Sequence, residues 1–194
     1  KRAMYRRIQT AKRILDLACG TGIVTTGLAK RFPEAEIVGV DITDDYLDVY
    51  RERIKKHGIN AQFILSNAET VKLTGQFDTV VSSYIPKYVD PDKLLANIAP
   101  YVIPGGVIVL HDFTLPTNFF ARRVWDAYNR MMNFIGIRLF PEWREVFDSG
   151  LTTLIRETRW FIDFPAALRR HGFTDIYSQY LSFRSSGIIW ATKL

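Results

Sequence analysis

The sequence has little that would form a disulfide or cross a membrane. Its one cysteine, Cys19, excludes an internal disulfide and is typical of a reducing compartment. No apolar run approaches the roughly 18 residues that span a bilayer, and no signal peptide is visible. The chain begins without an initiator Met, as expected of a fragment or of a chain without its leader. We therefore predict a cytoplasmic protein and leave peripheral contact with a membrane open.

The stretch that organises the chain runs from Arg13 to Gly22 and reads R-I-L-D-L-A-C-G-T-G. It starts as a short apolar run without helical period, which is typical of a strand buried on both faces. Glycines follow, and a helical pattern begins at about Ile23. A strand, a glycine turn and a helix bring backbone amides close to a nucleotide. The turn lacks the third glycine of a dinucleotide fingerprint, and no Lys-Ser/Thr pair follows as in triphosphate-binding loops.

Two carboxylates accompany this turn. Asp16 lies inside the apolar strand, where a carboxylate is costly without partners, so we expect it to cap turn amides or to meet a positively charged ligand. Asp41 ends the next predicted strand, 36–40, about 20 residues past the glycines, where an acidic side chain can accept hydrogen bonds from both hydroxyls of a ribose. Together they predict an adenosine-bearing cofactor. Cys19 has no histidine nearby in sequence, so we interpret it as a small space-filling residue.

Strands and helices alternate along most of the chain, which predicts one domain, 1–194, built on a doubly wound parallel sheet. A final pair of antiparallel strands is expected to close this sheet. The predicted strands are 14–18, 36–40, 61–65, 77–83, 107–110, 173–181 and 187–192, and the predicted helices are 4–12, 22–31, 43–57, one from Asp90, and 163–171.

Residues 113–162 interrupt this alternation and are rich in aromatic residues. The segment is too apolar for a solvated excursion, so we predict a helical cap packed over the carboxyl edge of the sheet. Whether its rings form core or line an apolar substrate pocket stays open. They include Phe119, Phe120, Trp125, Tyr128, Phe134, Phe140, Trp143, Phe147, Trp160 and Phe161.

Ligands of open parallel sheets bind beyond the carboxyl ends of the strands, so polar residues from five strand ends are expected to converge. The stretch Asp16–Gly22 resembles motif I of class I S-adenosylmethionine (SAM)-dependent methyltransferases. The motifs N-A-E at 67–69, F-D-T-V-V-S-S-Y at 77–84 and P-G-G-V-I-V-L at 104–110 follow in the order seen in the ubiquinone/menaquinone biosynthesis C-methyltransferases, and the closing G-F-T-D-I-Y is also similar.

This resemblance implies a Rossmann-like, mostly parallel seven-stranded sheet with a helical cap after the fifth strand. It also implies SAM as cofactor and S-adenosylhomocysteine (SAH) as product, with no metal site. Members of that family carry a further segment upstream that helps close the site. The residues implied to contact the cofactor are Asp16, Ala18, Cys19, Gly20, Thr21, Gly22, Asp41, Ile42, Asn67, Ala68, Glu69, Ser82 and Ser83.

The resemblance implies C-methylation of a small lipophilic acceptor that is aromatic or quinone-like. Lys87-Tyr88 stand where the family usually has an Arg-Asn pair facing the quinone ring, so another aromatic or isoprenoid acceptor stays open. A carbon acceptor needs a base, for which Lys87, Tyr88 and Asp112 are candidates. We hypothesise that His111 or Tyr84 is the acid/base residue.

The net charge is +6, and arginines recur among the aromatic residues of the cap. Weak peripheral membrane binding through the region Phe119–Arg138 is therefore predicted. Nucleic acid is disfavoured as a partner, because the chain has neither an N-P-P-Y-like motif nor a catalytic cysteine motif. The alternatives are methylation of another small metabolite at oxygen or nitrogen and a non-catalytic SAM- or lipid-binding module. A homodimer stays open.

Overall fold

The computed structural model describes residues 1–136, 138 and 150–194. Within these residues a seven-stranded sheet has the strand order β3-β2-β1-β4-β5-β7-β6. Neighbouring strands among β1 to β5 pair in parallel, whereas β7 is antiparallel to both of its neighbours. The predicted doubly wound, mostly parallel sheet is confirmed. The strands are β1 (Arg13–Leu17), β2 (Glu36–Asp41), β3 (Ala61–Leu65), β4 (Phe77–Ser83), β5 (Val102–Phe113), β6 (Phe173–Leu181) and β7 (Ser186–Lys193).

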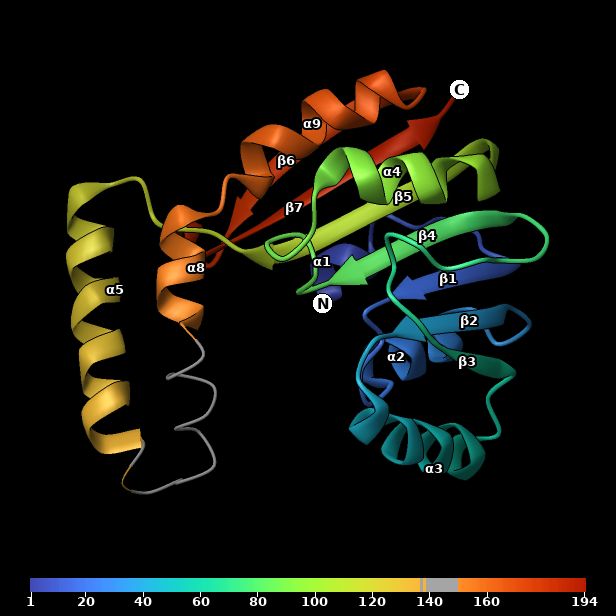
Figure 1. Ribbon diagram of the computed structural model, residues 1–194, viewed down its shortest axis with the longest axis horizontal. Coiled ribbons are helices and arrows are strands. Elements are labelled where there is room, and N and C mark those ends of the chain that lie inside the picture. The colour runs from blue at the N-terminus through green and yellow to red at the C-terminus, as the bar shows by residue number, and fades with distance from the viewer. Residues whose placement is uncertain (137, 139–149) are drawn as a thin grey trace.

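Helices cover both faces of the sheet (Figure 1). Side chains alternate along each strand, so Leu15 and Leu17 join the core beneath α4 and α9, whereas Ile14 joins the core beneath α1 and α2. The helical elements are α1 (Arg2–Tyr5), α2 (Ile23–Arg31), η1 (Asp44–Tyr46), α3 (Leu47–His57), α4 (Pro91–Ile98), η2 (Ala99–Tyr101), α5 (Phe119–Met131), the π-helical turn η3 (Met132–Gly136), α8 (Leu151–Glu157), α9 (Trp160–Arg170) and η4 (Ser182–Arg184).

Three predicted elements have clearly different boundaries in the structure. The helix expected over 4–12 ends at Tyr5, and the amide of Lys12, which a longer helix would pair internally, donates to Asp78 instead. β5 extends beyond the predicted 107–110 at both ends and takes in the turn-like residues 104–106. α9 begins at Trp160 rather than at residue 163, and the Trp160 indole donates to the carbonyl of Phe113 over 2.7 Å. Each of these differences depends on contacts distant in sequence.

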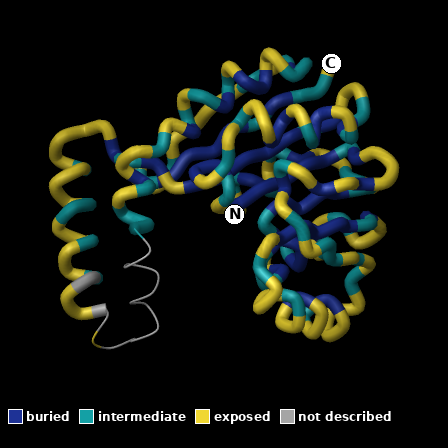
Figure 2. The backbone as a smooth tube through the Cα atoms, in the orientation of Figure 1, coloured by how far each residue is buried: buried dark blue, intermediate teal, exposed yellow. Residues whose placement is uncertain are grey.

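The expected cap is helical where the structure describes it, but α5 does not pack over the sheet. It stands on the side to which the parallel strands point, apart from the sheet, and it is exposed along most of its length (Figures 1 and 2). None of its residues is buried. Trp160 belongs to the core instead, with 3% of its surface exposed. The expectations for Phe140, Trp143 and Phe147 lie outside the described residues.

Candidate functional site

A cavity of about 640 Å³ opens at the carboxyl ends of β1, β2, β3 and β4. Four segments line it: the turn after β1, the end of β2 with the residues leading into η1, the residues after β3, and the loop after β4. The structure thus brings together the following predicted site residues: Ala18, Gly20, Asp41, Ile42, Asn67, Ala68, Glu69, Ser83, Tyr84 and Tyr88.

Other cavity residues were missed from the sequence. They lie at the end of a strand or in the loop after it, so a wider window around each strand end would have included them. Tyr46 could also have been identified as a candidate from its residue type, because it is an aromatic residue directly after the two aspartates of η1. The missed residues are Val40, Thr43, Tyr46, Ser66, Ile85 and Val89.

The turn after β1 needs unusual backbone conformations. Ala18 and Gly20 have positive φ angles of 55° and 51°, and both line the cavity. Gly22 caps α2 with φ 79°, and a Cβ there would lie 3.0 Å from the Tyr50 ring. Glycine therefore permits both the conformation and the packing of α3 against the turn. Thr21 and Gly22 do not line the cavity.

Cys19 is also placed away from the cavity. Its side chain packs with Tyr50 and Ile54, and only 5% of the residue is exposed. Burial raises the pKa of this thiol, and the nearby carboxylates Asp16 and Asp41 raise it further. A thiol that stays protonated is a poor nucleophile, in agreement with a space-filling role.

Asp41 connects the ends of β1 and β2 at the cavity wall. One carboxylate oxygen accepts the Gly20 amide at 2.7 Å, and the other accepts the Thr43 amide at 2.9 Å. Only 7% of the residue is exposed, it lines the cavity, and each of its carboxylate oxygens can accept a further hydrogen bond. Asp41 therefore combines a fixed position with free acceptor capacity.

Asp16 is fully buried behind the turn and does not line the cavity. Its Oδ2 accepts the Thr25 hydroxyl at 2.7 Å, whereas its Oδ1 has no hydrogen-bond partner among the described residues. Burial raises its pKa to about 7, and the charge of Asp41 adds to this rise against the Thr25 hydrogen bond. The expected capping of turn amides is wrong. An unpartnered buried carboxylate oxygen is the kind of group that a positively charged ligand would satisfy.

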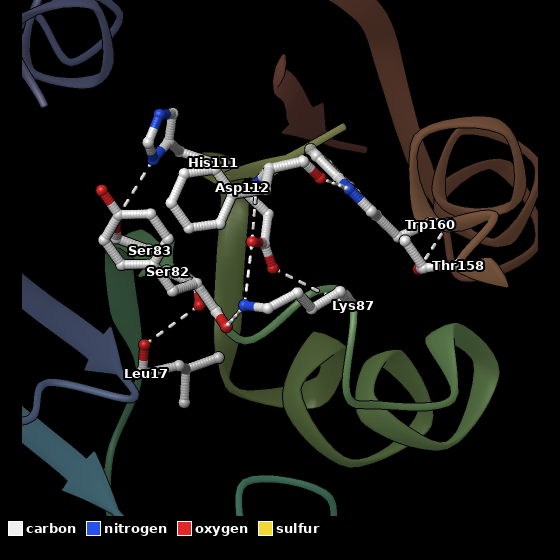
Figure 3. A network of polar contacts seen from close by, with 10 residues as sticks. Leu17, Ser82, Ser83, Lys87, His111, Asp112, Thr158 and Trp160 are labelled. Atoms are coloured by element: carbon white, nitrogen blue, oxygen red, sulfur yellow. Dashed lines mark hydrogen bonds and ion pairs between the residues drawn. The ribbon is translucent and has the colours of Figure 1, made fainter. Parts of the chain in front are cut away.

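On the other side of the cavity, Ser83 connects the lining to His111 (Figure 3). Its hydroxyl lies 3.2 Å from Nδ1 of His111, which is 6% exposed and does not line the cavity. Burial lowers the pKa of His111 to about 4, so the imidazole is neutral at pH 7. Tyr84 covers this histidine edge to face, with ring centroids 5.5 Å apart. Ser82 is fully buried and donates to the Leu17 carbonyl, so it too lies off the cavity.

Lys87 does not face the cavity. Its ammonium lies 3.0 Å from Oδ1 of the buried Asp112 and 2.7 Å from the carbonyl oxygen of Tyr84 (Figure 3). Burial lowers the pKa of Lys87, while the attraction of Asp112 opposes that change. Among the described residues no group of histidine, cysteine and carboxylate side chains could hold a metal ion.

The sheet order, the antiparallel β7 and the glycine turn facing an acidic residue on the next strand define the class I methyltransferase fold. The chain belongs to the methyltransferase domain family, whose model matches residues 8–147.

Similar proteins agree with this assignment. The chain is 31% identical over 140 residues to demethylmenaquinone methyltransferase of Thermus thermophilus, covering 70% of this chain and 64% of that protein. It is 25% identical over 179 residues to the ubiquinone/menaquinone biosynthesis C-methyltransferase UbiE of Pasteurella multocida, covering 90% and 62%. The chain thus spans less than two thirds of either relative.

The fold is also that of phosphoethanolamine N-methyltransferase 2 of Haemonchus contortus, solved in complex with SAM. The TM-score is 0.72 at 16% identity, over 98% of this chain and 51% of that one.

Proposed function

We propose that this chain is a SAM-dependent methyltransferase domain that methylates a small lipophilic acceptor, aromatic or quinone-like, at carbon. The observation that carries the proposal is Asp41, which two backbone amides fix in the cavity wall. Behind the neighbouring turn, a buried carboxylate oxygen of Asp16 has no partner among the described residues. The family and the similarity to demethylmenaquinone methyltransferase and to the ubiquinone/menaquinone biosynthesis C-methyltransferase support it.

In this proposal the turn and strand ends hold the cofactor. Asp41 accepts the ribose hydroxyls, and Asn67, Ala68 and Glu69 border the adenine. Asp16, buried behind the turn, attracts the cationic methionine end through its unpartnered carboxylate oxygen. Bound SAM supplies a methyl group already activated by its sulfonium. The chain's own task is to align the acceptor, to exclude water and to manage one proton.

The loop after β4 is our candidate for the acceptor side. Tyr84, Ile85, Tyr88 and Val89 give this wall an apolar and aromatic surface with two phenol hydroxyls. Such a surface suits an aromatic ring better than a charged metabolite. The same chemistry at oxygen or nitrogen of another small molecule is the nearest alternative, and a non-catalytic SAM-binding module is the next.

The test follows a radiolabelled methyl group from SAM into a lipid extract of the source cells, with SAM affinity measured in parallel by calorimetry. Label in an aromatic or isoprenoid lipid, with the new methyl on carbon by NMR, supports the proposal. Label at oxygen or nitrogen favours the nearest alternative. SAM binding without labelling of any lipid or metabolite favours the binding module, and no SAM binding at all contradicts the proposal.

Proton handling gives a prediction about Tyr84 and His111. We expect Tyr84→Phe to lower kcat by about tenfold or more. The phenol of Tyr84 lines the cavity, and loss of a general acid or base slows catalysis by at least about this factor. His111→Ala is expected to act through Ser83, since the imidazole contacts that hydroxyl and not the cavity. Steady-state kinetics test both variants, once calorimetry has shown that each binds SAM as tightly as wild type. Tyr101→Phe is the control. Unchanged turnover in both variants would exclude this acid/base assignment.

We also propose weak membrane contact through α5. Its apolar side chains are uncovered, with Phe119 74% and Phe120 75% exposed, and the arginines of the same helix suit anionic headgroups. The described residues include no helix that is both long and apolar enough to cross a bilayer.

Flotation with phosphatidylcholine vesicles, with and without phosphatidylglycerol, tests this contact. Binding is expected only with the anionic lipid, to weaken as salt is added, and to fall about tenfold in the double variant Phe119→Ser/Phe120→Ser. Ile162→Ser removes a comparably exposed apolar residue from α9 and serves as the control. Equal binding to both kinds of vesicle, or none to either, would contradict the proposal.

A further inference from the structure

The loop 84–89, which follows β4, has two sides with different surroundings. Tyr84, Ile85, Tyr88 and Val89 line the cavity, whereas Lys87 is turned the other way. The side chain of Lys87 is 2% exposed and that of Asp112 is fully buried. A charged pair buried so deeply between a loop and a strand needs a specific set of partners.

Asp112 holds this loop through both the main chain and the side chain of Lys87. Its Oδ2 accepts the backbone amide of Lys87 at 3.0 Å, and its Oδ1 lies 3.0 Å from the ammonium. Oδ1 also accepts the amide of Phe113 at 2.6 Å. Asp112 belongs to β5, whose centre is buried in the sheet, so the loop is fixed to the rigid part of the fold.

The ammonium of Lys87 also holds the tyrosines that face the cavity. It donates to the carbonyl oxygen of Tyr84. The backbone of Tyr84 has a φ of 79°, which is unfavourable for every residue except glycine. Its Nζ lies 4.2 Å from the ring centroid of Tyr88 and 5.7 Å from that of Tyr84. Cation–π attraction at these distances orients both rings.

We infer that Lys87 and Asp112 are positioning residues that set the shape of the acceptor wall, although neither touches the acceptor. This inference rests on the proposed function, which assigns the loop 84–89 to the acceptor side of the cavity. It assigns Lys87 a role different from the catalytic one expected from sequence, since its charge is neutralised at Asp112 rather than presented to a ligand. Acceptor selectivity is then set by how this pair holds Tyr84 and Tyr88.

The experiment compares Lys87→Met, Asp112→Asn and the double variant. We expect Lys87→Met to raise the acceptor KM by about tenfold or more, because small misplacements of positioning groups have effects of this size. The dissociation constant of SAM should change less than about twofold, since the pair does not contact the cofactor side of the cavity. The double variant should recover part of the loss, because no carboxylate is then left buried alone. It also keeps the test decisive if Lys87→Met alone does not fold.

Hydrogen exchange of the amides in 84–89 gives a readout that does not depend on catalysis. Faster exchange there in Lys87→Met, partly restored in the double variant, supports the inference. A fall in kcat at unchanged acceptor KM, with no recovery in the double variant, would make Lys87 a catalytic residue and overturn it. Unchanged exchange and unchanged KM would overturn it as well. If the wild-type protein transfers no methyl group but exchange responds as expected, the proposed function fails while the positioning role of the pair stands.

Discussion

Replacing Asp16 by asparagine is expected to stabilise the ligand-free protein at pH 8 while weakening its binding of SAM at least about tenfold. The two effects have one origin, the buried carboxylate whose Oδ1 has no partner among the described residues. Without ligand its charge is costly, and with a cationic ligand that charge is neutralised. Residues that bind ligands often carry such a conflict between stability and function.

The sign of the pH effect follows from the raised pKa. Asp16 has a pKa of about 7 in the folded protein against 3.8 in the reference state, because it is buried. Between these values the folded protein binds more protons than the unfolded chain, so this residue's stabilising contribution is complete below about pH 4 and is lost as the pH rises to about 7. Keeping the folded carboxylate ionised costs on the order of 4 kcal/mol. Asparagine removes that cost but buries an amide group that needs partners, so we expect a net gain of about 1–3 kcal/mol at pH 8.

Thermal unfolding of Asp16→Asn and wild type between pH 5 and pH 9 tests this prediction. The variant should unfold at a higher temperature than wild type at pH 8, and the difference should shrink toward pH 5. SAM affinity of the wild type should fall below pH 7, where Asp16 takes up a proton, and that dependence should disappear in the variant. Asp45→Asn changes an exposed carboxylate and is the control. Unaltered SAM affinity in Asp16→Asn would exclude contact between this carboxylate and the cofactor.

Much of the fold could be predicted because its signals are local. β4 has the predicted bounds, 77–83, since its centre is formed by the β-branched residues Thr79, Val80 and Val81, which favour a strand. α4 begins at the predicted Asp90-Pro91, where the Asp90 side chain accepts the amides of Asp92 and Lys93. The half of the cavity that we assign to the cofactor was predictable for a related reason, because parallel strands end at one edge and a residue at a strand end lies near that edge.

The half of the cavity that we assign to the acceptor could not be predicted in the same way. Lys87 points inward because Asp112 accepts both its amide and its ammonium, and nothing in residues 84–89 alone reveals a partner that belongs to another strand. His111 lies behind Ser83 because the two residues are opposite each other in the register of β4 and β5. The position of α5 was missed because an apolar helix face predicts burial without saying against what. Contacts between distant segments decide all three cases.

The second large effect is expected for Asp41→Ala, which should raise the dissociation constant of SAM by about 100-fold. Two hydrogen bonds from ribose hydroxyls to a charged acceptor are worth at least this much when water is excluded. The substitution also removes the acceptor of the Gly20 and Thr43 amides. Both amides border the cavity and can be rehydrated, so the free energy of unfolding should fall by only about 1–2 kcal/mol. Asp44→Ala, which removes an exposed carboxylate nearby, should change neither quantity appreciably.

The role of Asp41 toward ribose can be separated from its role in the turn. Calorimetry would compare SAH with an analogue that lacks the ribose 2′-hydroxyl, each bound to wild type and to Asp41→Ala. If Asp41 holds the ribose, wild type should bind the analogue about tenfold more weakly, whereas the variant should bind both ligands equally. If Asp41 serves only to fix the turn, both proteins should discriminate between the ligands to the same degree. The interaction free energy of this cycle therefore measures the contact itself, free of any change that the substitution makes to the Gly20 turn.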